Sequence, residues 1–454
     1  MIAETAWRDE AGSGLYVTIS PYQRCPPGWT PLVWLDRRQT SDVVEDLHTI
    51  VRPLPQPPKW AADLLTVALS AYAADRAAPR RAAADGWTRQ MRLSVPVVDP
   101  DGLDTSALAA VLGLLTSDEW EIVLRPGRPI WNAGLLPPCD PLPDIVALFS
   151  AGLDSLVASM ELARDAARGV HLVAHHDDPA LRDRQREIFG HLGSAPSRLL
   201  QFAADLQPRA EGSFACTRTE TTTRSRPLLV MAAAIVVAAA YGARRVVVPE
   251  NGQLALNLPL TASRIGSCSA RAAHPATLHL VNRLLETVGT EIRVDNPFLS
   301  MTKGEVCERA SHAGVPASVV TRTVSCGASR HADPAPGCRN CGYCHACLVR
   351  RAGLLRGYGS DPTRYGRDPR AAAALLGPGP ARRQPSLADL LALVRWLSED
   401  LTPEDVLAHA PLPAAADLAS CAAVVRRGRE ELTALLDAGF SDDVRRALHW
   451  SPRP

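Results

Sequence analysis

The segment 150–155 carries the side chains best suited to chemistry in this sequence, in the order Ser-Ala-Gly-Leu-Asp-Ser. It follows a run of apolar residues typical of a buried strand and precedes a helical pattern. A strand that ends in a small polar turn and opens a helix presents free backbone N–H groups, which form a ready site for phosphate. Ser150 and Ser155 add hydroxyl donors, and Gly152 lets a phosphate approach the backbone. Asp154 could cap the helix or hold Mg²⁺.

This turn resembles the S-G-G-x-D-S loop of the PP-loop ATP pyrophosphatases, which split ATP between the α and β phosphates and adenylate a substrate. Ala151 stands where that family usually has its first glycine, a change that affects binding only if this residue needs a positive φ. The alternative is an ordinary strand-turn-helix, and a Walker loop is excluded because no G-K-[ST] follows. The nucleotide contacts that the resemblance implies come from Ser150, Ala151, Gly152, Leu153, Asp154 and Ser155, with Mg²⁺ accompanying the ATP.

A cluster of cysteines is the second group of reactive side chains, since five of the eleven cysteines lie between residues 326 and 347. Such clustering, in a chain that shows no secretory signal at its start, favours a metal site over disulfides. Two C-x-x-C knuckles need a long excursion between them to face each other, so the evenly spaced run 338–347 suits one zinc ion poorly. We therefore predict a structural zinc site with the ligands Cys326, Cys341, Cys344 and Cys347. The spare ligand candidates are Cys338, His331 and His345. An iron–sulfur cluster is an alternative that the spacing allows.

Together, the loop and the cysteine motif are similar to the QueC family, the 7-cyano-7-deazaguanine synthases. That family joins an S-G-G-L-D-S loop to a zinc motif of the form S-C…C-G-x-C-x-x-C-x-x-R. The residues that match the zinc motif here are Ser325, Cys326, Cys341, Gly342, Cys344, Cys347 and Arg350. The segment 302–305 resembles the family's T-K-x-E segment. The resemblance covers residues 144–359, under half of the chain.

The resemblance implies an ATP-dependent, AMP-forming ligase. QueC enzymes bind ATP and 7-carboxy-7-deazaguanine and adenylate the carboxylate with release of pyrophosphate; ammonia then gives an amide, and a second activation gives the nitrile. Such a reaction needs groups that hold the phosphates and stabilise developing charge. The expected catalytic residues are Asp154 and Lys303. The expected substrate-binding residues are Arg224 and Arg226, which would face transferring phosphate, and Glu250 and Asn251, which would read a guanine-like edge.

The chain departs from ordinary QueC proteins, which are compact and lack both the first 140 residues and the C-terminal tail. The family's Y-G-Q-x-H segment is also replaced by His-His-Asp-Asp at 175–178. Enlarged relatives resemble the QueC-like proteins of bacterial anti-phage systems, the Qat systems and type IV CBASS, in which the deazaguanine is thought to be joined to a partner protein. We therefore expect an anti-phage enzyme that passes the acyl group to an amine of a protein encoded nearby.

Three other interpretations remain open. The chain could be a 7-cyano-7-deazaguanine synthase of queuosine biosynthesis that uses ammonia. It could be an inactive PP-loop fold that serves as a zinc-braced scaffold, although the retained Ser150, Asp154 and Ser155 argue against this. A tRNA-thiolating PP-loop enzyme is disfavoured by the net charge of +1, which argues against a large nucleic-acid footprint.

Apolar periodicity predicts the scaffold that must position these groups. From residue 144 onward strands and helices alternate, which is typical of a doubly wound, Rossmann-like parallel α/β sheet. The expected strands span 145–149, 170–174, 197–202, 245–248 and 291–294, and a nearly all-apolar helix spans 227–240. Ligands bind beyond the carboxyl ends of such strands, so the loops at 150, 175–178, 250–252 and 295–297 are expected to meet on one rim.

The length of 454 residues is consistent with two or three domains. The predicted parts are an N-terminal α+β accessory domain for docking or dimerisation (1–140), the QueC-like PP-loop domain with its zinc motif (141–360) and a helical C-terminal extension (361–454). The longest apolar run, 228–240, is too short to span a bilayer, and we expect a cytoplasmic protein. Lysine occurs only at Lys59 and Lys303, which singles out Lys303.

Overall fold

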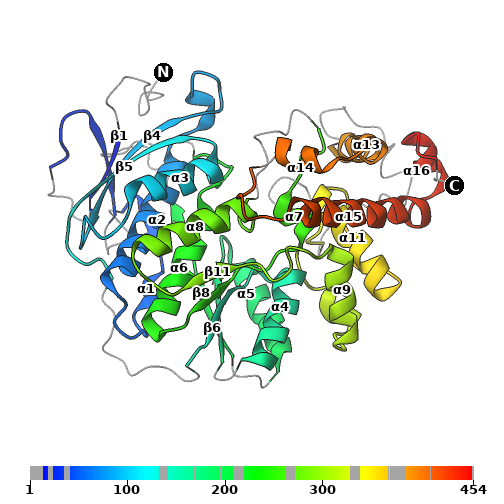
Figure 1. Ribbon diagram of the computed structural model, residues 1–454, viewed down its shortest axis with the longest axis horizontal. Helices are drawn as coiled ribbons and strands as arrows, with labels where there is room; N and C mark the ends of the chain where they lie inside the picture. The colour runs from blue at the N-terminus through cyan, green and yellow to red at the C-terminus, as the bar shows by residue number, and fades with distance from the viewer. Residues whose placement is uncertain are drawn as a thin grey trace. The chain divides into compact units, whose positions relative to one another are not determined.

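The computed structural model describes residues 14–18, 24–34, 41–131, 142–166, 169–193, 197–207, 219–261, 271–327, 338–366, 368, 385–409 and 411–451. Its contacts divide the chain into two compact units, each described by itself below (Figure 1). The first, here called the sheet unit, consists of Met1–Ser150, Ser159–Val248 and Ser269–Asp295. The second, here called the helical unit, consists of Ala151–Ala158, Pro249–Cys268 and Asn296–Pro454.

The sheet unit contains a five-stranded sheet in the order β11-β10-β6-β7-β8, and every neighbouring pair is parallel. Its strands are β6 (Ile145–Leu148), β7 (Val170–His175), β8 (Ser197–Phe202), β10 (Arg245–Val247) and β11 (Arg293–Asp295). The chain adds strands first on one side of β6 and then on the other, which is the doubly wound topology, and the switch point lies beside β6. The prediction of a parallel α/β sheet is therefore confirmed.

The helices that follow these strands are α4 (Leu153–Asp165), α5 (Pro179–Phe189), α6 (Arg226–Tyr241) and α8 (Pro275–Thr287), with a short 3₁₀ helix at Gly190–Leu192. Local sequence sets the ends of α6, because Pro227 occupies its first turn and Gly242, at φ +71°, closes it in the left-handed conformation. Nearly all of its apolar side chains are buried. A helix that is apolar all round must be covered on more than its sheet-facing side.

A second, four-stranded sheet has the order β2-β1-β4-β5, and its paired strands are also parallel. Its strands are β1 (Gly14–Thr18), β2 (Trp29–Val33), β4 (Gln90–Val97) and β5 (Glu119–Pro126). The helices of this region are α1 (His48–Val51), α2 (Lys59–Ala77), the 3₁₀ turn η1 (Arg80–Ala82) and α3 (Thr105–Thr116). The sequence led us to expect an α+β arrangement here, but α3 returns the chain so that β4 and β5 run parallel, as in a βαβ unit.

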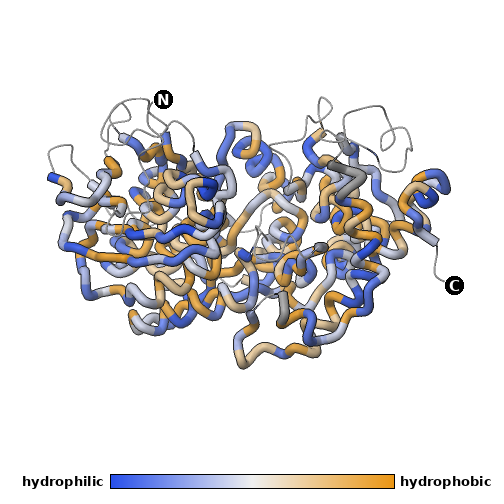
Figure 2. The backbone as a smooth tube through the Cα atoms, turned by 90° about the horizontal axis from the view of Figure 1, so that it is seen from above, coloured by the Kyte–Doolittle hydropathy of each residue, from blue (hydrophilic) through white to orange (hydrophobic). Residues whose placement is uncertain are grey.

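The two sheets of the sheet unit are joined by helix packing, since α2 contacts α6 and α3 contacts α8. A two-stranded antiparallel ribbon adds a further link by pairing β3 (Val43–Glu45) with β9 (Ala204–Leu206). The division of the chain at residues 140 and 360 remains a prediction, whereas these contacts group the described residues up to 131 with the five-stranded sheet. Figure 2 shows that hydrophobic and hydrophilic stretches alternate along the backbone.

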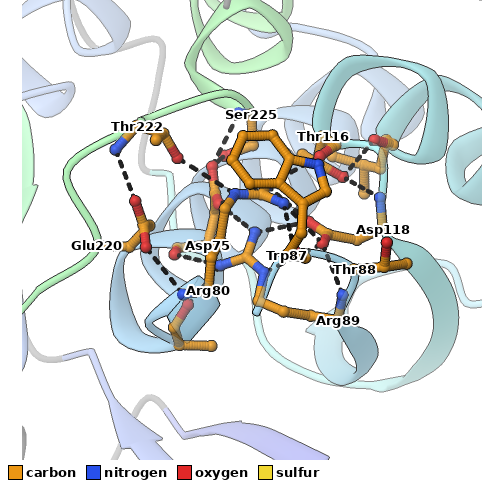
Figure 3. A network of polar contacts seen from close by, with 12 residues as sticks. Asp75, Arg80, Trp87, Thr88, Arg89, Thr116, Asp118, Glu220, Thr222 and Ser225 are labelled. Atoms are coloured by element: carbon orange, nitrogen blue, oxygen red, sulfur yellow. Dashed lines mark hydrogen bonds and ion pairs between the residues drawn. The ribbon is translucent and has the colours of Figure 1, made fainter. Parts of the chain in front are cut away.

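Buried ion pairs reinforce this join (Figure 3). The guanidinium of Arg89 lies 2.6 Å from both Asp75 Oδ1 and Asp118 Oδ2, and all three side chains are almost fully buried. Asp75, on α2, also accepts hydrogen bonds of 2.9 and 2.7 Å from the backbone N–H and hydroxyl of Ser225, the residue before α6. Arg80 donates to both oxygens of Asp118 at 3.0 and 2.9 Å. The network connects residues 75–118 with the start of α6.

The helical unit contains the N-terminal part of α4 and eight further helices among its described residues. These are α7 (Gly252–Leu256), α9 (Lys303–His312), α10 (Ala317–Val320), α11 (His345–Tyr358), α13 (Pro385–Ser398), α14 (Pro403–His409) and α15 (Leu418–Gly439), followed by the short α16 (Asp442–Ala447). α15 contacts α7, α9, α11 and α14. Its apolar face and α11 share one hydrophobic core, which includes Leu348, Val424 and Leu432. Among the described helices, none combines the length and apolar character needed to cross a membrane.

Candidate functional site

The turn between β6 and α4 adopts the conformation that a glycine would favour at its second position. Ala151 has φ +60° and a completely buried side chain, and its carbonyl accepts a 3.2 Å hydrogen bond from the Val324 N–H. The departure from the family's glycine is therefore structurally significant, since the left-handed conformation costs an alanine roughly 1 kcal/mol. Ser155 Oγ donates to the Gly152 carbonyl at 2.9 Å, which tightens the first turn of α4.

Asp154, on the first turn of α4, lies in a buried cluster of polar groups in the helical unit. Its Oδ1 accepts a 2.7 Å hydrogen bond from Lys303 Nζ, and its Oδ2 accepts from the Asn251 backbone N–H at 3.1 Å and from Asn251 Nδ2 at 2.9 Å. Asp154 and Lys303 are 5% and 2% exposed. A charged pair this buried persists only when its remaining lone pairs are satisfied, which Asn251 does here. Asp154, Lys303 and Asn251 therefore belong to one unit, the helical unit, and so does Glu250, the residue before Asn251.

Glu250 and Asn251 follow strand β10, as expected, but only one of them has a carboxyl or amide left for a ligand. The amide of Asn251 is used within the protein, since its Oδ1 caps α7 by accepting from the Leu254 N–H at 3.3 Å. Burial, together with the negative charge of Asp154, raises the pKa of Glu250 to about 7 despite the opposing charge of Lys303. The backbone of Glu250 is fixed by the Asn296 side chain. Its N–H donates to Asn296 Oδ1 at 3.2 Å, and its carbonyl accepts from Asn296 Nδ2 at 2.7 Å.

Lys303 is the first residue of α9, and its position is set by the cap of that helix. Thr302 and Glu305 form a capping box, in which the Thr302 hydroxyl accepts from the Glu305 N–H at 3.1 Å and the Glu305 carboxylate accepts from the Thr302 N–H at 2.8 Å. The side chain of Lys303 passes over Gly353 on α11, where an added Cβ would lie 2.6 Å from Lys303 Cγ. The sequence segment that resembled T-K-x-E is therefore a helix start that aims a lysine at Asp154.

The structure brings together the four cysteines that the spacing argument selected. Their Sγ atoms all lie within 4.8 Å of one another, and those of Cys341 and Cys347 are 3.8 Å apart. Zinc–sulfur bonds of 2.3 Å at tetrahedral corners place sulfurs about 3.8 Å apart, so the group fits a single tetrahedral ion. Four sulfurs this close leave no room for a multi-iron cluster between them. Contact with Cys326 raises the pKa of Cys341, but contacts with Cys344 and Cys347 outweigh it and lower that pKa to about 7.

The surroundings of the cysteines also suit metal binding. Backbone N–H groups donate to sulfur, from Cys341 to Cys326 Sγ and from Cys344 to Cys341 Sγ, both at 3.4 Å. The fully buried Arg350 holds the preceding segment by donating to the Thr323 hydroxyl and the Val320 carbonyl, each at 2.7 Å. Cys338 and His345 fall outside the cysteine group, and His331 lies outside the described residues.

Arg224, Arg226 and the segment 175–178 belong to the sheet unit, where each has a contact that stabilises the fold. Arg224 is 3% exposed and stacks on Trp87, with Cζ 4.4 Å from the ring centroid, and burial and Arg80 lower its pKa to about 10. Arg226 lies 3.6 Å from Asp177. The ring of His175 makes edge contacts with Tyr72 and Phe202, and Asp178 caps α5.

Two residues beside Lys303 were missed by sequence reasoning. Gln253 accepts a 3.0 Å hydrogen bond from the Lys303 N–H, and Glu431 accepts one of 3.0 Å from the Gly304 N–H. Each contact joins positions far apart in the chain, and neither residue belongs to a recognisable motif. The only sequence signal was the Thr-x-x-Glu pattern at 302–305, which predicts a helix start but not what packs against it.

Comparisons with known proteins match a region that contains Lys303, Glu250, Asn251 and the four cysteines. Residues 217–357 match the family model described as "Queuosine biosynthesis protein QueC". A 7-cyano-7-deazaguanine synthase from Thiobacillus denitrificans is 28% identical over 240 residues, covering 50% of this chain and 99% of that protein. The synthase from Novosphingobium aromaticivorans is 29% identical over 252 residues, covering 51% of this chain and 99% of that protein.

A shorter region is more similar still. The synthase from Ralstonia nicotianae is 42% identical over 77 residues, which are 17% of this chain and 31% of that protein. Among solved structures, the reductase domain of a nonribosomal peptide synthetase from Mycobacterium tuberculosis covers 70% of this chain and 83% of that chain, at 12% identity and a TM-score of 0.20; a likeness this weak carries no argument. The chain therefore carries a QueC-like domain and is similar to 7-cyano-7-deazaguanine synthases over about half of its length.

Proposed function

We propose that this chain is an ATP-dependent, AMP-forming ligase that adenylates the carboxylate of 7-carboxy-7-deazaguanine, releases pyrophosphate and passes the acyl group to an amine of a partner protein. The observation that carries the proposal is the pairing of Lys303 with Asp154 in the same unit as the four-cysteine group. Lys303 and the four cysteines lie in the region that the QueC family model matches. The role in anti-phage defence, in the cytoplasm and beside a partner encoded nearby, belongs to the same proposal.

The nucleotide end of the site is the turn 150–155. Its backbone N–H groups and the Ser150 hydroxyl hold the phosphates, and Asp154 would supply a carboxylate to Mg²⁺. The Ser155 hydroxyl joins them by turning away from the Gly152 carbonyl, to which it donates here. Lys303 is a point charge for the phosphate oxygens whose charge grows as the carboxylate attacks. The resemblance also assigns Arg224 and Arg226 to phosphate. Their contacts with Trp87 and Asp177 in the sheet unit make this the least supported part of the assignment.

The purine end of the site is assigned to Glu250 and Asn251. An ionised Glu250 accepts hydrogen bonds from the N1–H and 2-amino group of a guanine-like ring. Asn251 acts indirectly, because its side chain already holds Asp154 and caps α7. It is thus a positioning residue for the carboxylate that would hold Mg²⁺.

The metal of the four-cysteine group is proposed to be zinc. Thiolates are the ligands of structural zinc, and four of them leave no open position for catalysis. The ion would brace the segment that joins α10 to α11, and α11 carries Gly353, over which Lys303 passes. The proposed role of zinc is therefore structural.

A second candidate is an ammonia-using 7-cyano-7-deazaguanine synthase, favoured by the relatives of that name that align over 99% of their own length. The protein acceptor is favoured instead by the length of this chain, because half of its 454 residues lie outside such an alignment. An inactive scaffold is the weakest candidate, because a buried Lys–Asp pair is costly to retain without a use.

The acceptor is tested by mass spectrometry. The chain is co-expressed with the proteins encoded beside it and supplied with carboxydeazaguanine, ATP and Mg²⁺. We expect an adduct on an amine of the partner that the Asp154→Ala protein does not make. If the partner stays unmodified and free nitrile accumulates when ammonium is present, the acceptor is ammonia and the partner proposal is wrong.

A further inference from the structure

Helix α15 contacts the segment that carries Lys303 although it lies outside the region matched by the QueC family model. Three residues of one helical face make these contacts, Arg427, Gly428 and Glu431. Their spacing places them on neighbouring turns of the same side of α15. All of them belong to the helical unit, as does the segment 300–305 that they contact. Figure 1 shows α15 beside α11 and α7.

Glu431 caps the start of α9 with a buried carboxylate. Its Oε2 accepts from the Gly304 N–H at 3.0 Å, and its Oε1 accepts from the Thr302 hydroxyl and, at 2.9 Å, from Arg356 Nη1. Glu431 is only 7% exposed. A negative charge at a helix N-terminus is stabilised by the free N–H groups and the helix dipole. Because Thr302 and Gly304 flank Lys303, the carboxylate fixes the backbone on both sides of that lysine.

A second contact reaches the backbone of Lys303 itself. Gln253 Oε1 accepts from the Lys303 N–H at 3.0 Å, and the side chain of Gln253 lies against Gly428 of α15. A Cβ at Gly428 would lie 2.0 Å from Gln253 Nε2, so only glycine lets α15 approach this closely. The same holds at Gly304, where a Cβ would lie 2.4 Å from Glu431 Oε1. Gly428 therefore lets α15 pack closely against Gln253, and Gly304 lets α9 pack closely against Glu431.

Arg427 completes the contact. Its Nε donates to Glu305 Oε1 at 2.7 Å, and its Nη2 donates to the Ser300 carbonyl at 2.8 Å. Glu305 is the carboxylate of the capping box, so Arg427 stabilises the group that caps Thr302. Side chains of α15 thus contact Thr302, Gly304 and Glu305 directly. The backbone of Lys303 is linked to α15 through the side chain of Gln253.

We propose that α15 positions Lys303 toward Asp154, with Glu431 as the principal positioning residue. The inference rests on the proposed function only in giving Lys303 a task at the transferring phosphate. The inference adds one requirement to the proposed function. Correct placement of Lys303 depends on α15, a helix that lies outside the region matched by the QueC family model. A misplacement of 1 Å at such a group costs up to about a hundredfold in rate.

The test compares Glu431→Ala and Glu431→Gln with the exposed neighbour Glu430→Ala, which lies on the same helix and points to solvent. We expect Glu431→Ala to lower kcat for pyrophosphate release about tenfold with KM for ATP nearly unchanged. Glu431→Gln should recover part of the rate, because it keeps one acceptor oxygen, and Glu430→Ala should match the unaltered protein. A loss confined to KM, or an equal loss in Glu430→Ala, would overturn the inference.

A double-mutant cycle separates this inference from the proposed function. If Glu431 acts through Lys303, Glu431→Ala should change kcat by less than about twofold in a Lys303→Ala background, because coupled residues are not additive. A full tenfold further loss there would show that Glu431 acts by another route. A Lys303→Ala protein as active as the parent would instead contradict the task proposed for the lysine.

Amide hydrogen exchange measures the positioning of this segment directly and does not require the variants to be active. The amides of 302–305 should exchange faster in Glu431→Ala and Glu431→Gln than in Glu430→Ala, while the rest of α11 stays protected. Unchanged protection of 302–305 in Glu431→Ala would overturn the positioning role even if the chain never cleaves ATP.

Discussion

At the scale of single residues, the structure places Lys303 and Asn251, both predicted site residues, in contact with Asp154, and their role in a site stays a prediction. Asp154 and Lys303 were predicted from local patterns, and local patterns also set the helix starts that carry them. The φ of Ala151 follows from the same logic, since the resembling families have glycine there. The contacts of Gln253 and Glu431 could not be predicted, because they are tertiary contacts with the segment 302–305, which lies far from both residues in the chain.

Glu250 gives a prediction about pH. Burial and the charge of Asp154 raise its pKa to about 7, so the folded protein keeps its proton at pH values where the unfolded chain has lost it. The folded state then binds more protons than the unfolded state between about pH 4.5 and 7, and stability falls as the pH rises through that window. Replacing Glu250 by glutamine removes this loss.

We therefore expect Glu250→Gln to raise the melting temperature at pH 8 by more than at pH 5.5, measured by thermal unfolding at both pH values. The exposed Glu430→Gln should change both values equally. A Glu250→Gln protein whose pH dependence matches that of the parent would show that the carboxyl is not buried beside Asp154.

At the scale of elements, the four-cysteine group connects a loop to a helix. Cys326 follows α10, whereas Cys347 lies within the first turn of α11. The spacing rule chose Cys326 over Cys338, and the structure brings the chosen four together. Element boundaries were less predictable: the strand expected at 291–294 is β11 at Arg293–Asp295, because a short buried strand carries no periodic signal at its ends.

The metal prediction belongs to this scale. Cys344→Ser should lose bound zinc and lower the melting temperature, because binding at a structural site contributes to folding free energy. Cys338→Ser is the matched control, since Cys338 is also buried but lies outside the group. Metal analysis of both proteins is the measurement, and zinc retained by Cys344→Ser at the level of the control would contradict the ligand set.

At the scale of the whole molecule, the described residues up to 131 belong to the same compact unit as the five-stranded sheet, and an ion-pair network connects them to the start of α6. The sequence predicts a separate N-terminal domain at 1–140, and that division stays a prediction. A buried network of Arg and Asp side chains has no sequence signature, since each residue alone resembles a surface charge. The all-apolar α6 was the available signal, because such a helix needs a cover such as α2.

Breaking this network should therefore destabilise the sheet unit. We expect Arg89→Met to lower the free energy of unfolding by about 3 kcal/mol, because it leaves Asp75 and Asp118 buried without their common partner. Arg92→Met, which removes an exposed pair with Glu121, should cost less than about 1 kcal/mol. Urea unfolding of the two variants measures the difference, and equal losses would mean that the buried pairs contribute no more than surface ones.

We propose that the turn 150–155, with Asp154 and Lys303, cleaves ATP between the α and β phosphates to activate a carboxylate. The most direct measurement is the nucleotide product formed by the purified protein with ATP, Mg²⁺ and 7-carboxy-7-deazaguanine, with and without the carboxylate. We predict AMP and pyrophosphate only when the carboxylate is present, and neither from a folded Asp154→Ala protein. Release of ADP and phosphate, or AMP formation that persists in Asp154→Ala, would contradict the account.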